Sequence, residues 1–189
     1  MGKIIMVIGG ARSGKSGFAE KKVLEIGHKI GYMATAVITD EDMAKRIEHH
    51  RASRPKEWPT FERYKAFEVL KKDKAFVACD TLIFDCVTTA VTSIMLDEPV
   101  DYDKDSQEVM DKVEVRVKKE LATLLDMVTA TGQNLVLVTN EVGLGIVPPY
   151  RLGSIFRDIA GRMNQYLAGR ADEVYFIVSG LPMTLKHNL

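Results

Sequence analysis

A glycine-rich octapeptide near the start of the chain restricts the fold more than any other stretch. It follows the apolar run 4–8 and precedes a segment with helical spacing, and its residues are Gly9, Gly10, Ala11, Arg12, Ser13, Gly14, Lys15 and Ser16. A strand, a glycine-rich turn and a Gly-Lys-Ser sequence at a helix start are typical of the phosphate-binding P-loop. Glycine backbones let successive N–H groups turn toward an anion, and the helix N-terminus adds further donors. We therefore predict a nucleoside triphosphate site.

The side chains of this segment suggest how the phosphates are bound. Lys15 is placed to reach the β- and γ-phosphates, and the Ser16 hydroxyl is placed to ligate Mg²⁺. Asp85 follows the apolar strand 81–84, which is where a Walker B carboxylate holds Mg²⁺ in P-loop enzymes. An aspartate after a strand also occurs as a turn or cap residue. Because a P-loop is present, we favour the metal role and predict Ser16 and Asp85 as metal ligands.

Composition narrows the class of protein. With 189 residues we predict one catalytic domain, 1–189. Lys plus Arg and Asp plus Glu both number 26, so there is no net charge to attract nucleic acid as the main partner. Two cysteines, Cys79 and Cys86, make no disulfide framework and fit a reducing compartment. No apolar segment reaches bilayer-spanning length, so we expect a cytoplasmic protein without a membrane span.

Strand-like and helix-like segments alternate along the chain. Alternation of this kind predicts an α/β fold with a mainly parallel sheet flanked by helices, and with ligands at the carboxyl ends of the strands. The predicted strands are 4–8, 30–34, 81–84, 134–138 and, last, 173–178. The predicted helices are 16–26, 40–53, 66–72, 87–96, 109–128 and 151–167. On such a sheet the P-loop, Thr35, Asp85 and the polar run 139–141 lie at one edge.

A histidine pair is the second informative feature. His49 and His50 lie among Arg46, Arg51 and Arg54 in the predicted helix 40–53. A solvated basic helix face explains such a cluster, whereas a metal site does not, because adjacent histidines on a helix diverge. A third interpretation is nucleophilic: a neutral imidazole attacks phosphorus, while nearby arginines keep it uncharged and neutralise phosphate.

Several blocks together resemble one family. They are the P-loop, the stretch from Arg46 to Pro55 followed by Trp58 and Glu62, Asp85-Cys-Val-Thr-Thr, and the segments 139–148 and 156–165. In this order they are similar to the bifunctional adenosylcobinamide kinase/adenosylcobinamide-phosphate guanylyltransferase family of cobalamin biosynthesis. The resemblance covers nearly the whole chain. It is most specific in the histidine-containing block and in the Asn-Glu-Val-Gly block.

This resemblance implies a RecA-like P-loop fold, a homotrimer and two reactions. The first phosphorylates adenosylcobinamide, and the second transfers GMP from GTP to the resulting phosphate through a guanylyl-histidine. It implies His49 as the nucleophile, with Lys15 as the second catalytic residue, and GTP, ATP and Mg²⁺ as the nucleotides and metal used. Beyond the P-loop, the implied nucleotide contacts are Thr35, Ala36, Val37, His50, Arg51, Ala52, Ser53, Glu62 and Asp85.

Some roles stay open at this point. A carboxylate such as Glu62 suits the N1–H and amino group of guanine, but equally a surface salt bridge. Asn140 and Glu141 are candidates for binding or orienting substrate. An ordinary small-molecule P-loop kinase without a covalent intermediate, and a nucleotide-binding switch, are the alternative functions.

Overall fold

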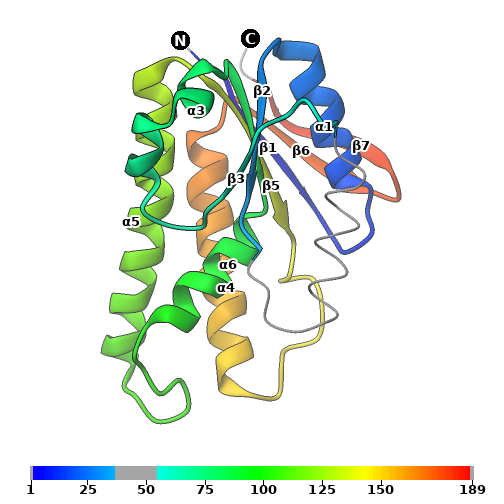
Figure 1. The fold of residues 1–189 in the computed structure, drawn as a ribbon. Helices are drawn as coiled ribbons and strands as arrows, with labels where there is room; N and C mark the ends of the chain where they lie inside the picture. The colour runs from blue at the N-terminus through cyan, green and yellow to red at the C-terminus, as the bar shows by residue number, and fades with distance from the viewer. Residues whose placement is uncertain (1, 37–54, 188–189) are drawn as a thin grey trace.

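The computed structural model describes residues 2–36 and 55–187, in which a seven-stranded sheet carries helices on both faces (Figure 1). The strands are β1 Ile4–Gly9, β2 Ile30–Ala34, β3 Thr60–Glu62, β4 Thr81–Asp85, β5 Asn134–Asn140, β6 Glu173–Val178 and β7 Leu181–His187. The helices are α1 Lys15–Ile26, the 3-10 helix η1 Phe67–Lys72, α3 Lys74–Ala78, α4 Val87–Asp97, α5 Gln107–Thr131 and α6 Arg151–Arg170.

The strand order is β3-β2-β4-β5-β1-β6-β7. All neighbouring strands are parallel except β6 and β7, which pair antiparallel as a hairpin. Strand β5 lies between the strand that precedes the P-loop and the strand that ends at Asp85. This insertion is the arrangement of RecA-like P-loop folds, and it confirms the predicted fold class. The carboxyl ends of the six parallel strands therefore meet at one edge.

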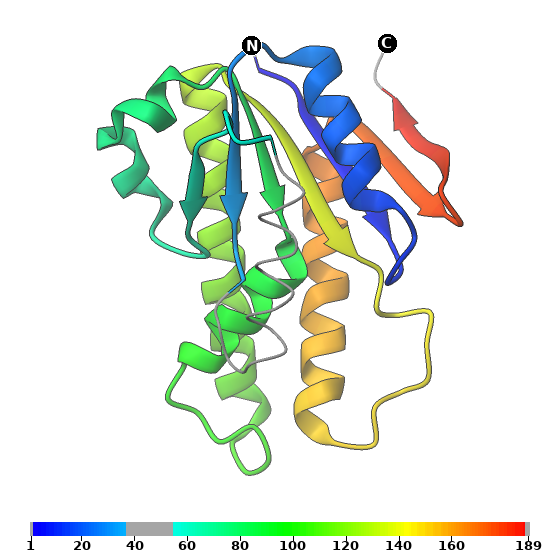
Figure 2. The ribbon, with the colours of Figure 1, turned by 45° about the vertical axis from the view of Figure 1, so that its right-hand side comes forward.

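Two apolar layers hold the helices to the sheet. Successive side chains of a strand point to opposite faces. In β1, Ile4, Met6 and Ile8 join the larger cluster, which packs against α4, α5 and α6, whereas Ile5 and Val7 join the cluster beneath α1. Figure 2 shows α1 in front of the sheet and α5 and α6 behind it. The strands are apolar on both faces because helices cover both.

Most predicted elements are confirmed, with small shifts of their ends. The five predicted strands and the helices 16–26, 87–96, 109–128 and 151–167 all form. Gly132 ends α5 with a φ of 71°, a left-handed conformation that favours glycine. The predicted helix 40–53 lies outside the described residues. Among the helices that are described, none is long and apolar enough to cross a bilayer.

The prediction was wrong at the two edges of the sheet. Strand β3 and helix α3 were not predicted, and 173–178 is not the last strand, because β7 follows it. The segment predicted as a helix over 66–72 is a 3-10 helix that starts after Ala66, whose φ is 53°. Strand β3 has only three residues and the side chains of β7 are mostly exposed, so neither shows the buried apolar run that marks a strand.

A buried carboxylate at the start of β6 makes acid stability testable. Glu173 Oε1 lies 2.6 Å from Lys3 Nζ, and Glu173 Oε2 accepts a hydrogen bond from the Tyr175 hydroxyl at 2.7 Å. Burial by itself would raise the pKa of Glu173, but the hydrogen bonds from Lys3 and Tyr175 bring that pKa below its ordinary value. A carboxyl with a lowered folded pKa stabilises the fold above its ordinary pKa, about 4.3, and loses this effect as pH falls.

We expect Glu173→Gln to lower the free energy of unfolding at pH 7 by about 1–2 kcal/mol, because charge-assisted hydrogen bonds are lost. The difference from the native chain should shrink as pH falls from about 5 toward 3, where the carboxyl takes up a proton. Urea unfolding of both proteins at several pH values measures this difference in the free energy of unfolding. Glu108→Gln, at an exposed pair with Lys112, is the control. A difference that stays constant with pH would contradict this account.

Candidate functional site

The P-loop joins the end of β1 to the start of α1 at the carboxyl edge of the sheet (Figure 2). Gly14 precedes α1 with a φ of 91°, and Arg12 has a φ of 58°, so both lie in the left-handed region. These two residues bend the chain sharply between strand and helix. The free N–H groups of the first helical turn thus lie at the turn, where a helix N-terminus favours an anion.

Close packing fixes the shape of the turn. A Cβ atom at Gly9 would lie 2.5 Å from Ser13 Oγ and 2.7 Å from the Ile177 carbonyl oxygen, so only glycine fits. The Ser13 carbonyl accepts a hydrogen bond from Gly180 N–H at 2.8 Å, and the Gly9 carbonyl accepts one from Glu141 N–H at 3.1 Å. The P-loop is therefore held by the β6–β7 turn on one side and by the chain after β5 on the other.

The two predicted phosphate and metal residues of the loop lie in the first turn of α1. Lys15 Nζ donates to the Gly10 carbonyl at 3.2 Å, which holds the ammonium group over the turn. Ser16 is half-buried one residue further on. A Cβ at Gly10 would meet no protein atom within 4 Å, so that side of the turn is open. Lys15 and the helix N-terminus together supply positive charge at an accessible turn.

Asp85 lies at the same edge, at the end of β4, and its Oδ2 accepts a hydrogen bond from the Tyr32 hydroxyl at 2.5 Å. Only β5 separates β4 from β1, so two strand spacings, about 10 Å, lie between the axes of the strands that end at Asp85 and Gly9. A carboxylate and a serine hydroxyl are hard oxygen donors of the kind that Mg²⁺ prefers, together with substrate phosphates. The donor set of Ser16 and Asp85 therefore fits Mg²⁺.

Thr35 and Ala36 follow β2 beside Asp85. The Thr35 hydroxyl donates to the Cys86 carbonyl and accepts from Cys86 N–H, each at 2.8 Å, and Thr35 N–H donates to the Asp85 carbonyl. Thr35 is only 1% exposed, so its hydroxyl is occupied in joining the ends of β2 and β4. Ala36 is half-buried. The structure thus brings Thr35 and Asp85 together, as predicted for this edge.

A buried polar network, which sequence reasoning did not predict, lies behind Asp85. Asn140 at the end of β5 donates through Nδ2 to Thr88 Oγ1 at 2.6 Å, and its carbonyl accepts from Asn164 Nδ2 at 3.1 Å. Asn164 Oδ1 in turn accepts from the Thr139 hydroxyl at 2.8 Å. The network joins β5 to α4 and α6. Asn140 therefore holds the end of β5 in place beside the P-loop.

The thiol of Cys86 belongs to the same region. Its Sγ lies 3.1 Å from Thr88 Oγ1 and 2.9 Å from Thr89 Oγ1. Burial raises the pKa of the Cys86 thiol, and the neighbouring charge of Asp85 raises it further, against the hydrogen bonds from the threonines. The thiol is thus held in its neutral form at neutral pH.

Glu62 lies at the far end of the same edge. It ends β3, pairs with Ala34 in the neighbouring strand, and is exposed. Four strand spacings, about 19 Å, separate β3 from β1 in the sheet. Glu62 therefore lies at one end of the row of strand ends, and Asp85 lies between Glu62 and the P-loop.

The remaining predicted residues fall outside the described part of the chain. They are the nucleophile candidate His49, its neighbours Arg46 and Arg54, and the nucleotide contacts Val37, His50, Arg51, Ala52 and Ser53. The described chain leaves the carboxyl edge at Ala36 and resumes at Pro55. The structure thus places the P-loop, Thr35, Ala36, Glu62 and Asp85.

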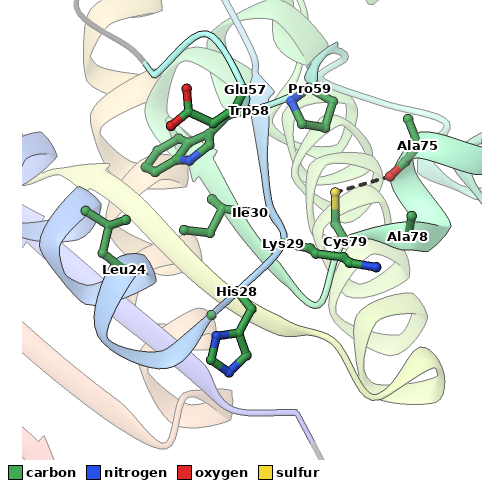
Figure 3. A pocket seen from close by; sticks show the side chains of 11 residues that line it. Leu24, His28, Lys29, Ile30, Glu57, Trp58, Pro59, Ala75, Ala78 and Cys79 are labelled. Carbon is green, nitrogen blue, oxygen red and sulfur yellow. Dashed lines mark hydrogen bonds between the residues drawn. The ribbon is translucent and has the colours of Figure 1, made fainter.

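A pocket of about 490 Å³ lies elsewhere, near the amino end of β2 (Figure 3). Leu24, Ile30, Trp58 and Cys79 are among its lining residues. Since β2 runs from Ile30 to Ala34, this pocket and the P-loop edge lie at opposite ends of the sheet. None of the predicted site residues within the described chain lines this pocket.

Three features at the P-loop edge escaped prediction. Tyr32, which binds Asp85, has no neighbouring motif in the sequence, and Asn164, which binds Thr139 and Asn140, lies in the block 156–165 but was given no role. The turn at Ser179 and Gly180, which contacts the P-loop, belongs to the unpredicted β6–β7 hairpin. A Ser-Gly pair between two runs of strand-forming residues is the signal that indicates such a hairpin.

Comparison with known proteins identifies the family of this chain. Residues 5–185 match the family model described as cobinamide kinase / cobinamide phosphate guanyltransferase. The chain is 42% identical to the bifunctional adenosylcobalamin biosynthesis protein CobU of Escherichia coli, over 97% of this chain and 99% of that protein. It is 37% identical to the bifunctional adenosylcobalamin biosynthesis protein CobP of Pseudomonas aeruginosa, over 96% of each.

Among solved structures, a KaiC-like protein from Pyrococcus horikoshii aligns with a TM-score of 0.46 and 14% identity, over 92% of this chain and 70% of that one. The fold class rests on the strand order and not on this likeness. The match of the family model over nearly the whole chain, and the full-length relatives, carry the assignment. The chain belongs to the cobinamide kinase / cobinamide phosphate guanyltransferase family.

Proposed function

We propose that this protein phosphorylates adenosylcobinamide and then transfers GMP from GTP to the phosphate, giving adenosylcobinamide-GDP for cobalamin biosynthesis. The observation that carries the proposal is the P-loop, with Lys15 and Ser16, at the same sheet edge as Asp85 in a chain of this family. A triphosphate site explains both reactions, because each breaks a phosphorus–oxygen bond of a nucleoside triphosphate.

In the kinase step, the residues of the turn bind and orient ATP or GTP. The N–H groups at the start of α1 and the Lys15 ammonium group stabilise charge on the γ-phosphoryl oxygens as it moves to the substrate hydroxyl. Ser16 and Asp85 would hold Mg²⁺, which supplies charge neutralisation at the β- and γ-phosphates. Because little covalent chemistry is asked of the protein in phosphoryl transfer, positioning by these groups accounts for most of the catalysis.

In the guanylyl step, His49 is the nucleophile. A ring nitrogen of His49 attacks the α-phosphorus of GTP, the bond from that phosphorus to the bridging oxygen breaks, and pyrophosphate leaves. A phosphate oxygen of adenosylcobinamide phosphate then attacks the same phosphorus, the phosphorus–nitrogen bond breaks and His49 is released. Glu62 accepts hydrogen bonds from guanine. The other contacts to the nucleotide come from two stretches of the chain, Thr35, Ala36 and Val37, and His50, Arg51, Ala52 and Ser53.

We further infer a homotrimer of single-domain subunits that works in the cytoplasm. The family resemblance supports the trimer, and the free, buried Cys79 and Cys86 suit a reducing compartment. The balance of 26 basic and 26 acidic residues gives no reason to expect nucleic acid as a partner.

Intact-mass spectrometry after incubation with GTP and Mg²⁺ tests the proposal. We expect the protein to gain the mass of one GMP per chain, and adenosylcobinamide phosphate to remove it, because the guanylyl group passes to that acceptor. A plain kinase would phosphorylate adenosylcobinamide without gaining mass. A nucleotide-binding switch would show neither change. Either outcome would contradict the two-step scheme.

A further inference from the structure

Among the described residues, exposed apolar side chains form two groups, one in the loop between β5 and α6 and one along the hairpin of β6 and β7. Leu144 is 82% exposed, Ile146 97%, Val147 63% and Tyr150 62%. We call residues 144–150 the apolar loop. The other large exposed apolar side chains among the described residues are isolated on helices or belong to strands β6 and β7. Clustered exposure of this kind marks a surface that another molecule covers.

The apolar loop begins beside the P-loop. Asn140, the last residue of β5, pairs with Gly9, and the next residue donates its N–H to the Gly9 carbonyl at 3.1 Å. In Figure 2 the loop continues in yellow from the tip of β5, below the blue turn that holds the P-loop, to the start of α6. The chain that carries the apolar side chains therefore leaves the sheet at the same edge as the triphosphate site, beside the P-loop.

Both ends of the apolar loop are anchored. Before it, Gly143 N–H donates to Glu141 Oε1 at 2.5 Å and the Gly143 carbonyl accepts from Arg157 at 2.8 Å. At its other end, the Pro148 carbonyl accepts from Ser154 Oγ at 3.2 Å, and a Cβ at Gly153 would lie 2.6 Å from the Tyr150 ring. Between the anchored ends, the side chains from Leu144 to Val147 are directed at solvent. Because the ends are already fixed, the loop loses less conformational entropy when a ligand binds to it.

We propose that the apolar loop binds the corrin macrocycle of cobinamide, so that Leu144, Ile146 and Val147 cover its apolar, methyl-bearing surface. This inference rests on the proposed function. Phosphates and ribose bind through polar and charged groups, and the proposed guanine contact, Glu62, is on β3, about 19 Å from β1 in the sheet, so the nucleotide does not explain this surface. The substrate hydroxyl must reach the γ-phosphate at the P-loop, and the macrocycle attached to it is too large for the turn itself. An apolar surface on the loop that leaves the sheet beside the P-loop is where that macrocycle would lie.

The test is the double variant Leu144→Ser/Ile146→Ser. Loss of two apolar contacts should raise the KM and Kd for adenosylcobinamide by roughly 10- to 100-fold, and leave the Kd for GTP and the formation of the GMP adduct within about twofold. Val115→Ser is the matched control, since Val115 is 67% exposed on α5, outside both the apolar loop and the P-loop, and should change neither constant.

Two measurements keep the inference separable from the proposed function. If the native protein neither phosphorylates adenosylcobinamide nor gains GMP, the proposed function fails. If the native protein does both and the double variant binds adenosylcobinamide as tightly as the native chain, only the assignment of the apolar loop fails. Sedimentation of the double variant completes the test, because a change of its oligomeric state would identify the loop as a contact between copies and overturn the proposal.

Discussion

Replacing Lys15 with alanine is expected to lower the rate of adenosylcobinamide phosphorylation on the order of 10³-fold, the scale seen when one preorganised donor to transition-state charge is removed. The Lys15 ammonium group already lies over the turn, 3.2 Å from the Gly10 carbonyl, so little reorganisation is needed to meet a γ-phosphate. We expect a loss in guanylyl transfer too, because the same turn holds GTP. Steady-state assays of each step, the second started from adenosylcobinamide phosphate, measure both effects.

The matched control is Lys21→Ala. Lys21 is an exposed lysine of the same helix, away from the P-loop, and its loss should change both rates by less than about twofold. Thermal unfolding of the Lys15 variant should show a folded protein, because Lys15 packs no core. Retention of kinase activity in that variant would exclude Lys15 from the phosphoryl-transfer step.

Replacing His49 with alanine is expected to separate the two activities. Without the imidazole no phosphorus–nitrogen bond forms, so the GMP adduct and guanylyl transfer should fall below detection. Phosphorylation of adenosylcobinamide should continue within about tenfold of the native rate, since Lys15, Ser16 and Asp85 are intact. α-Phosphate-labelled GTP followed by denaturing electrophoresis detects the adduct, and a product assay follows the kinase step.

His28→Ala serves as the control for this experiment, because His28 is exposed after α1 at the opposite edge of the sheet. It should keep the adduct and both activities. Acid-labile label that persists in the His49 variant would show that another residue carries GMP. The Lys15 variant should lose both steps, whereas the His49 variant should lose only guanylyl transfer. These two results together would show that both reactions use the triphosphate site and that only one uses the nucleophile.

The central part of the fold was predictable because its physical signals are local. Strands β1, β4 and β5 are continuous apolar runs covered by helices on both faces, and α5 repeats apolar residues at threes and fours. Strand β7 lacks such a signal: it lies at the edge, contains Pro182 and leaves its side chains mostly exposed. Its formation depends on pairing with β6, which no single segment reveals.

The candidate site, too, was predictable where the signal is local and unpredictable where it depends on distant parts of the chain. The P-loop, Asp85 and Thr35 were predictable, because each comes directly after an apolar strand and parallel strands end at one edge. The bond from Tyr32 to Asp85 and the bond from Asn140 to Thr88 were not. Both join residues about 50 positions apart, and their contact depends on strand order and register. Those are properties of the whole sheet and not of any motif.

The place of β1 in the sheet has a consequence for how the protein is made. Its two neighbours are β5 and β6, so Ile5 pairs with Val136 on one side and Glu173 on the other. A ribosome therefore releases the P-loop strand long before either partner exists, and non-local pairing of this kind forms slowly. Because the β6–β7 turn also contacts Ser13, we expect the P-loop to reach its final shape only when the last hairpin has left the exit tunnel. A chain that ends before residue 180 is therefore expected to bind nucleotide more weakly than the full chain.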